Sequence, residues 1–279
     1  NDLIFLGGTS FDFDKRISSP WLNIAKGKFV IPKLLLTRLN NKTKITYIRK
    51  IDRNVLAASI KQEYKKYIEL IKKECKSKEN SIPKIKIKSQ NPNYETYVNN
   101  INAIIKNIKN KKLNKVVISR IVEYVLSNNI SIVNLIHYLN KNYTNCFNFI
   151  ITLNKNTIFI GSTPEKIIQL KDQAFTIDAI AGSSKKKKYI KDSKEIDEHN
   201  FVIKHINKQM DNITSTIFIP KKPTILNLPY IYHLYTKITG KLKNKMHILD
   251  LLTKLYPTPA LLGEPHKYAL KEINKYEKI

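Results

Sequence analysis

Apolar residues recur at helical spacing in several parts of the chain. Between residues 94 and 111 the apolar positions fall on one face of a helix: Val98, Ile101, Ile104, Ile105 and Ile108. A comparable stripe at Ile60, Tyr64, Ile68 and Ile71 predicts a helix over 57–75. The chain as a whole therefore predicts helices over 57–75, 94–111, 131–139, 194–212, 246–254 and 264–277.

Short runs of β-branched and aromatic residues predict strands between these helices. The runs cover 28–32, 45–48, 116–118, 121–126, 147–153, 157–160, 167–170, 175–180 and 231–239. Asn154-Lys155-Asn156 separates two of them and predicts a hairpin. Because strands come in groups rather than alternating with helices, the pattern favours an α+β fold with large mixed or antiparallel sheets and flanking helices.

One polar stretch interrupts the pattern. Residues 76–92 are rich in lysine and contain two prolines, which is typical of an exposed connector. At roughly 100–200 residues per domain, 279 residues make one large domain or two small ones. We interpret the connector as a break within a single domain over 1–279, between an N-terminal part (1–75) and the remainder (93–279).

The net charge of +28 raises the question of nucleic-acid binding. Of the 50 basic residues only five are arginine, the residue that base readers favour: Arg16, Arg38, Arg49, Arg53 and Arg120. Lysine, asparagine, isoleucine and tyrosine, which are abundant here, have A/T-rich codons. An A/T-biased genome accounts for this composition, so we expect non-specific attraction to polyanions and no specific nucleic-acid partner.

Cysteine content and hydropathy bear on location. Cys75 and Cys146 form neither a disulfide framework nor a zinc-binding spacing, which favours a reducing cytoplasm. No apolar stretch reaches the roughly 18 residues that a membrane helix needs, and no leader pattern is present. The chain begins with Asn1 rather than methionine, so we expect a piece of a longer protein.

Several polar positions are candidates for chemistry. Gly161 and Gly182 each follow a strand beside hydroxyl or acidic residues, where a backbone must approach another group closely or simply turn. Glu195 and Glu198 share one face at the start of a predicted helix. Such acids complement the helix dipole, and their carboxylates also suit Mg²⁺. His233 lies on a strand, where a lone histidine is more often structural than functional.

Six segments in this order resemble the chorismate-utilising enzymes, which include isochorismate synthase, salicylate synthase, anthranilate synthase component I and aminodeoxychorismate synthase component I. The segments are Lys-Val-Val-Ile-Ser-Arg (115–120), Gly-Ser-Thr-Pro-Glu (161–165), Ala-Ile-Ala-Gly-Ser (179–183), Lys-Glu-Ile-Asp-Glu-His (194–199), His-Leu-Tyr-Thr (233–236) and Leu-Tyr-Pro-Thr-Pro-Ala-Leu-Leu-Gly (255–263). The resemblance is clear over 93–277 and weaker over 3–31. It implies an anthranilate synthase component I-like fold and chorismate as the substrate.

Two positions point to the branch of the family that adds water. Lys115 stands where isochorismate and salicylate synthases have a water-activating lysine and anthranilate synthases a glutamine-type residue. Ala181 stands where aminodeoxychorismate synthases have a nucleophilic lysine. The resemblance therefore implies an isochorismate synthase-like isomerase that adds water at C2 of chorismate and expels the C4 hydroxyl, feeding menaquinone or siderophore synthesis.

The same resemblance implies roles for individual residues. Lys115 would be the base and Glu165 the acid, with Glu198 as a Mg²⁺ ligand and Glu195 as a second candidate. These roles require a lowered lysine pKa and a raised carboxyl pKa. The substrate would be held by Ala181, Gly182, Ser183, His233, Thr236, Thr258 and Ala260.

The resemblance also leaves alternatives open. Family members continue beyond this C-terminus into further strands, a second metal-binding glutamate and a substrate-binding lysine. We therefore expect a fold that is incomplete at both ends. The alternatives to an isochorismate synthase are a salicylate synthase and an inactive truncated relic with a basic surface. The oligomeric state is not predicted.

Overall fold

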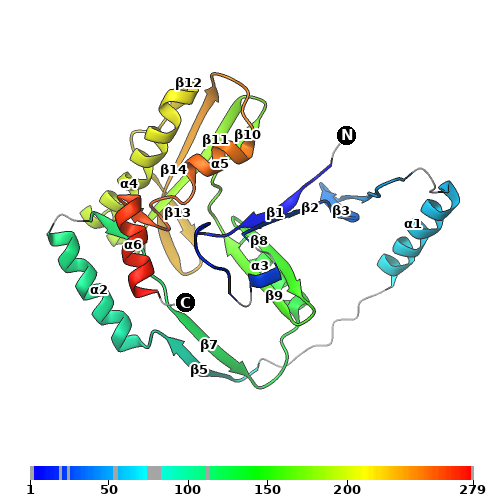
Figure 1. The fold of residues 1–279 in the computed structure, drawn as a ribbon, viewed down its shortest axis with the longest axis horizontal. Coiled ribbons are helices and arrows are strands. Elements are labelled where there is room, and N and C mark those ends of the chain that lie inside the picture. Colours follow the sequence, from blue (N-terminus) through cyan, green and yellow to red (C-terminus); the bar gives the residue numbers. More distant parts are fainter. Residues whose placement is uncertain are drawn as a thin grey trace. The chain divides into compact units, whose positions relative to one another are not determined.

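The computed structural model describes residues 3–18, 21–23, 26–52, 56–73, 83–110 and 113–277 (Figure 1). Its internal contacts divide the chain into two compact units, one of Asn1–Glu79 with Ile150–Ile160 and one of Asn80–Phe149 with Gly161–Ile279. Cys75 and residues 76–82 of the expected connector lie outside the described residues. The single domain expected over 1–279 stays a prediction.

The N-terminal segment of the first unit contains two antiparallel strand pairs and a helix. Strand β1 (Leu6–Thr9) pairs with β2 (Gly27–Val30), and β3 (Leu34–Leu39) pairs with β4 (Lys42–Tyr47). Asn40 and Asn41 both have positive φ, as a two-residue hairpin turn requires. In helix α1 (Ala57–Lys72), Glu63 accepts hydrogen bonds from Tyr47 at 2.6 Å and from Arg49 at 3.0 Å. These bonds attach α1 to the residues at the end of β4.

The second unit is built on a five-stranded antiparallel sheet. Its strands run in the order β10-β11-β14-β12, and β13 also pairs with β14. Their bounds are β10 Gln169–Lys171, β11 Ala174–Ser184, β12 Thr214–Phe218, β13 Thr224–Leu228 and β14 Ile231–Leu242. The long strands β11 and β14 pair over almost their whole length, with one bulge between Ala181 and Ser183.

Helix α4 (Ser193–Met210) lies along this sheet (Figure 1). Alternate residues of β11, beginning with Phe175, point to one face and meet the apolar stripe of α4. Helix α5 (Ile248–Leu255) completes the core. The buried core residues are Phe175, Ile177, Ala179, Ala181, Val202, Ile206, Met210, Ile238, Leu242, Leu251 and Leu255. This packing fixes the first turn of α4 relative to the end of β11.

Smaller elements complete the described chain. Antiparallel pairs join β5 (Ile85–Asn91) to β7 (Ile121–Leu126), β8 (Phe147–Asn154) to β9 (Thr157–Thr163), and β6 (Lys115–Val116) to β15 (Gly263–Glu264). The further helices are α2 (Tyr94–Lys109), α3 (Ile132–Asn142) and α6 (His266–Tyr276). Gly263 has a φ of +130°, and a side chain there would overlap the Lys115 carbonyl, so only glycine permits this approach of β15 to β6.

The α+β prediction is confirmed, and most predicted elements are present within a few residues. The expected connector needs a correction, because residues 85–91 within it form strand β5. Ile85 and Ile87 alternate with lysines and are exposed, so the segment has a polar composition despite its extended backbone. Strands β12 and β13 were also not predicted. Within the described ranges, no helix combines the length and apolarity needed to cross a membrane.

Candidate active site

A pocket of about 200 Å³ opens in the second unit at the ends of β9 and β11. That volume is below the ~300–1,000 Å³ typical of sites for drug-sized ligands and suits a small metabolite. The pocket is lined by Thr163, Pro164, Glu165, Ile180, Ala181, Ser183, Glu198, His233, Ala260 and Leu261. Six of the residues expected from the sequence therefore lie around one cavity.

Lys115 lies beside this pocket on strand β6 and is buried, with 9% of its surface exposed. Its Nζ donates a hydrogen bond to the Pro259 carbonyl at 2.5 Å and lies 3.4 Å from Oε1 of Glu198. Burial lowers the pKa of Lys115, and the Glu198 carboxylate opposes this effect only in part. The neutral amine that a general base needs therefore forms at a lower pH here than it would in water.

Glu165 follows strand β9 and lines the pocket. Burial, with repulsion from Asp178, raises the pKa of Glu165 to about 7, although Lys115 acts in the opposite direction. The carboxyl is thus close to half protonated at neutral pH and can donate a proton. The residues expected as base and acid have pKa values displaced towards neutrality from opposite sides, which is a pattern of acid–base sites.

Glu195 and Glu198 lie in the first two turns of α4, where Lys194 bridges them. Its Nζ lies 3.0 Å from Oε1 of Glu195 and 3.1 Å from Oε2 of Glu198. The Lys194 side chain is 72% exposed and can therefore move away into solvent. Another cation could then reach both carboxylates. A pair of carboxylates that already holds a positive charge between its oxygens fits a hard, oxygen-binding ion such as Mg²⁺.

The bulge in β11 brings the pocket wall against α4. Gly182 has a φ of +75°, and a Cβ there would lie 2.5 Å from the Glu195 carbonyl oxygen. The next backbone amide, that of Ser183, donates to Oε2 of Glu195 at 2.6 Å. The turn expected to help hold the substrate therefore binds a carboxylate of the protein in this structure. Glu195 is held in place by this bond, and Glu198 is the acid that faces the pocket.

Two hydrogen-bonded histidines lie behind and beside the pocket. The Nδ1 of His233 is 2.8 Å from the Ser183 hydroxyl, and both residues line the cavity. His199 donates from Nδ1 to the Ala181 carbonyl at 3.1 Å, which leaves its Nε2 to accept from the Thr236 hydroxyl at 2.8 Å. Thr236 is buried in this network and is not among the lining residues, so its hydroxyl positions α4 against β14.

The segment after α5 supplies a further wall. Ala260 lines the pocket as expected, whereas Thr258 is buried and does not. The Thr258 hydroxyl is buried without a hydrogen-bond partner among the described residues. The carbonyl of the same residue accepts from the amides of Leu261 and Leu262, both at 3.0 Å. Thr258 thus shapes the loop that presents the Pro259 carbonyl to Lys115.

Sequence reasoning missed several contributors. Lys194 belongs to one of the six family-like segments, yet nothing in its spacing shows that its ammonium joins two carboxylates. Asp178 lies on β11, thirteen positions after Glu165. It raises the pKa of Glu165 because the fold brings the two carboxyl groups near each other. Tyr235 donates to Oδ1 of Asp178 at 2.9 Å, and burial raises the pKa of Tyr235 to about 12. Asp178 and Tyr235 are offset by two positions in the register of the paired strands, so residue type alone gave no signal for this contact.

Comparison with known proteins places this geometry in context. Isochorismate synthase MenF of Bacillus subtilis (strain 168) is 25% identical over 286 residues, covering 98% of this chain and 60% of the relative. Isochorismate synthase EntC of Escherichia coli (strain K12) is 25% identical over 177 residues, covering 60% of this chain and 45% of the relative. The chain thus spans about 60% of the length of the first relative.

Solved structures show the same fold. The menaquinone-specific isochorismate synthase MenF of Escherichia coli superposes with a TM-score of 0.73 at 20% identity, covering 100% of this chain and 64% of that one. Anthranilate synthase component I of Streptococcus pneumoniae TIGR4 superposes with a TM-score of 0.77 at 15% identity, covering 98% of this chain and 65% of that one. A family model described as chorismate binding enzyme matches residues 1–279, and the chain belongs to this family of chorismate-binding enzymes.

Proposed function

We propose that this chain catalyses the Mg²⁺-dependent conversion of chorismate to isochorismate. The observation that carries the proposal is the placement of Lys115 and Glu165 at one pocket with pKa values displaced in opposite directions. The relatives named as isochorismate synthases support the same reaction class. Their names also support menaquinone or siderophore synthesis as the use of the product.

Lys115 would act as the general base. Its neutral amine would take a proton from a water molecule as the water oxygen bonds to C2 of the substrate ring. The Pro259 carbonyl holds Nζ in place at 2.5 Å, and burial favours the neutral form. The proton gained by Lys115 is stabilised by Glu198, whose Oε1 is 3.4 Å away.

Glu165 would act as the general acid. Its proton would pass to the C4 hydroxyl, which leaves as water while the ring double bonds shift. One water is consumed and one is released, so the substrate and product are isomers. The raised pKa of Glu165 keeps this proton available near neutral pH. His233 and Ser183, 2.8 Å apart, would offer hydrogen bonds to substrate oxygen atoms at the pocket wall.

The acidic residues of α4 would hold the metal. Glu198 faces the pocket, and Glu195 lies beside it, bound to the Ser183 amide. When bound, Mg²⁺ would supply a positive charge that holds a substrate carboxylate. The departure of Lys194 from between the two glutamates would free their oxygens for this role.

The setting proposed for this reaction is a reducing cytoplasm. Cys146 is a free, half-buried thiol, and Cys75 lies outside the described residues. We further propose chorismate as the small-molecule partner and no specific nucleic-acid partner, since lysines rather than arginines supply most of the charge.

The test is a chromatographic assay of the purified chain with chorismate and Mg²⁺, run with and without EDTA. Metal-dependent formation of isochorismate supports the proposal. Formation of salicylate with pyruvate would replace it with a salicylate synthase. A folded chain with no turnover would favour an inactive member of the family and would contradict the proposed activity.

A further inference from the structure

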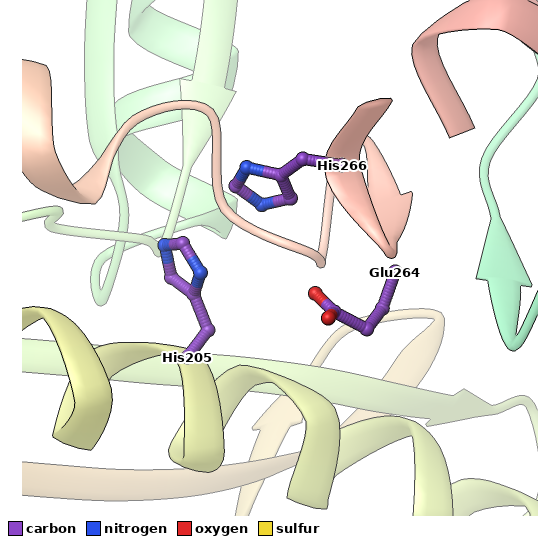
Figure 2. A group of neighbouring side chains, drawn as sticks. All are labelled: His205, Glu264 and His266. Atoms are coloured by element: carbon purple, nitrogen blue, oxygen red, sulfur yellow. The ribbon is translucent and has the colours of Figure 1, made fainter. Parts of the chain in front are cut away.

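Three potential metal ligands converge away from the lining of the pocket. They are His205 near the end of α4, Glu264 in β15 and His266 at the start of α6 (Figure 2). One ligand atom from each lies within 4.8 Å of the other two. The two imidazole rings have centroids 4.7 Å apart, and Figure 2 shows the Glu264 carboxylate directed towards the space beside them.

The hydrogen bond of His205 determines which ring nitrogen is available. Its Nε2 lies 3.2 Å from the carbonyl oxygen of Leu255. A carbonyl can only accept, so Nε2 carries the hydrogen and Nδ1 keeps its lone pair. Metal-binding histidines commonly donate their second N–H to a backbone carbonyl in this way, which fixes the ring orientation.

His266 provides a second, independent observation. Its Nε2 is buried and has no hydrogen-bond partner among the described residues. A buried polar atom without a partner is energetically unfavourable, so such atoms usually have a bound water or ion. One nitrogen of the same imidazole lies in the cluster that also holds the Glu264 carboxylate.

The charge state of the cluster suits a metal. Burial lowers the pKa of both imidazoles. At His205 the hydrogen bond to the Leu255 carbonyl opposes this effect, whereas His266 and Lys208 add to it. At His266 the Glu264 carboxylate opposes it. Neutral imidazole is the form that binds metals. The donor set is therefore two neutral nitrogens and one carboxylate.

We propose that His205, Glu264 and His266 form a binding site for a divalent transition-metal ion, with Zn²⁺ as the ion that fits best. Two histidines, one glutamate and an open position for water make a known zinc coordination set. Ligand distances of about 2.0–2.2 Å require the donor atoms to approach to roughly 3.5 Å of one another. Side-chain rotations can provide this. Imidazole ligands disfavour Mg²⁺, which separates this site from Glu195 and Glu198.

The site would join elements that position the pocket residues. Glu264 is paired directly with Lys115 in the β15–β6 ladder, and His205 lies on the helix that carries Glu198. An ion bound by both would clamp α4 to β15. Its expected contribution is therefore to the stability of this arrangement rather than to the reaction.

The test measures binding of Zn²⁺ and Co²⁺ to the full chain after treatment with EDTA and dialysis. We expect one Zn²⁺ per chain and a Co²⁺ complex with the visible absorption of nitrogen and oxygen ligation. Loss of a residue that only orients a metal ligand weakens metal binding by about 10–100-fold. H266Q and E264Q each remove one of three ligands, so they should weaken binding by at least this much. H137Q removes a histidine of α3 that lies outside the cluster and should bind Zn²⁺ as the parent chain does.

Two further measurements separate a lost metal ligand from a lost fold. Circular dichroism of each variant without metal shows whether it is folded, and Zn²⁺ should raise the Tm of the parent chain and of H137Q but not of H266Q. E198Q should retain one Zn²⁺, since Glu198 belongs to the other site. A folded parent chain that binds no Zn²⁺, or a folded H266Q that binds it equally well, would overturn the proposal.

Discussion

The Nζ of Lys115 lies 3.4 Å from Oε1 of Glu198, so the residue proposed as the base is paired with the residue proposed to bind Mg²⁺. The two side chains come from β6 and α4 and meet only because β15 aligns β6 beside the loop that follows α5. Burial and this ion pair act on the pKa of Lys115 in opposite directions, and burial is the larger effect. A change at either residue therefore changes the surroundings of the other.

The pH dependence of activity follows from Glu165. A general acid must be protonated, so kcat/KM should fall as pH rises through the pKa of about 7. Burial is the larger cause of this raised pKa, and the negative charge of Asp178 adds to it. D178N removes that charge, while an asparagine oxygen can still accept the hydrogen bond of Tyr235. The falling limb of the profile should therefore move to lower pH in D178N. An unchanged limb would show that another group controls it.

The same raised pKa predicts a pH-dependent loss of stability. The folded chain holds the Glu165 proton up to about pH 7, whereas the unfolded chain releases it near 4.5, so stability falls as pH rises through this window. E165Q removes the cost of a buried charge. Its free energy of unfolding should exceed that of the parent chain at pH 8, by up to about 3 kcal/mol, and the gain should be much smaller at pH 4. Urea denaturation at pH 8 and pH 4 measures the free energy of unfolding of both chains. An equal gain for E165Q at the two pH values would contradict the prediction.

Lys194 should compete with Mg²⁺ for the two glutamates. K194M removes the bridging ammonium, so Mg²⁺ should bind several-fold more tightly, as measured by calorimetry. The metal-free variant should also lose stability, because Glu195 and Glu198 then repel each other. The matched control is K191M, which removes the same charge from an exposed position three residues earlier. If Mg²⁺ affinity rises equally in both variants, the increase comes from the change in net charge alone.

Gly182 should not tolerate a side chain. G182A places a Cβ 2.5 Å from the Glu195 carbonyl oxygen at a φ of +75°, so we expect a loss of about 1–3 kcal/mol in stability together with weaker Mg²⁺ binding. G8A is the control, since a Cβ at Gly8 meets no atom within 4 Å. Thermal denaturation of both variants measures the difference. Equal Tm values would show that the bulge in β11 can relax.

The sequence predicted those parts of the site that belong to contiguous segments. Glu165, Ala181, Ser183, Glu198 and His233 were expected together and do line one pocket. Their neighbours in the chain fix their local geometry, so a segment is enough to find them. Thr236 was also expected at the substrate; it does not line the pocket, and its hydroxyl contacts His199 on α4. Its role in substrate binding stays a prediction.

What was missed depends on contacts between distant parts of the chain. His205 and His266 are separated by about sixty positions, and no spacing rule connects them to Glu264. The Pro259 carbonyl that holds Lys115 is a backbone group, which every residue has, so the residue type at this position does not indicate the contact. Strand β5 was missed for a different reason: Ile85 and Ile87 are exposed, so burial did not shape its composition.

The most direct test of water addition is to run the reaction in ¹⁸O-labelled water and analyse the product by mass spectrometry. The account predicts isochorismate with one ¹⁸O, at the new C2 hydroxyl, from the parent chain, and no isochorismate from a folded K115A. Unlabelled isochorismate, or labelled isochorismate formed equally well by K115A, would contradict the account of Lys115 as the base that activates water.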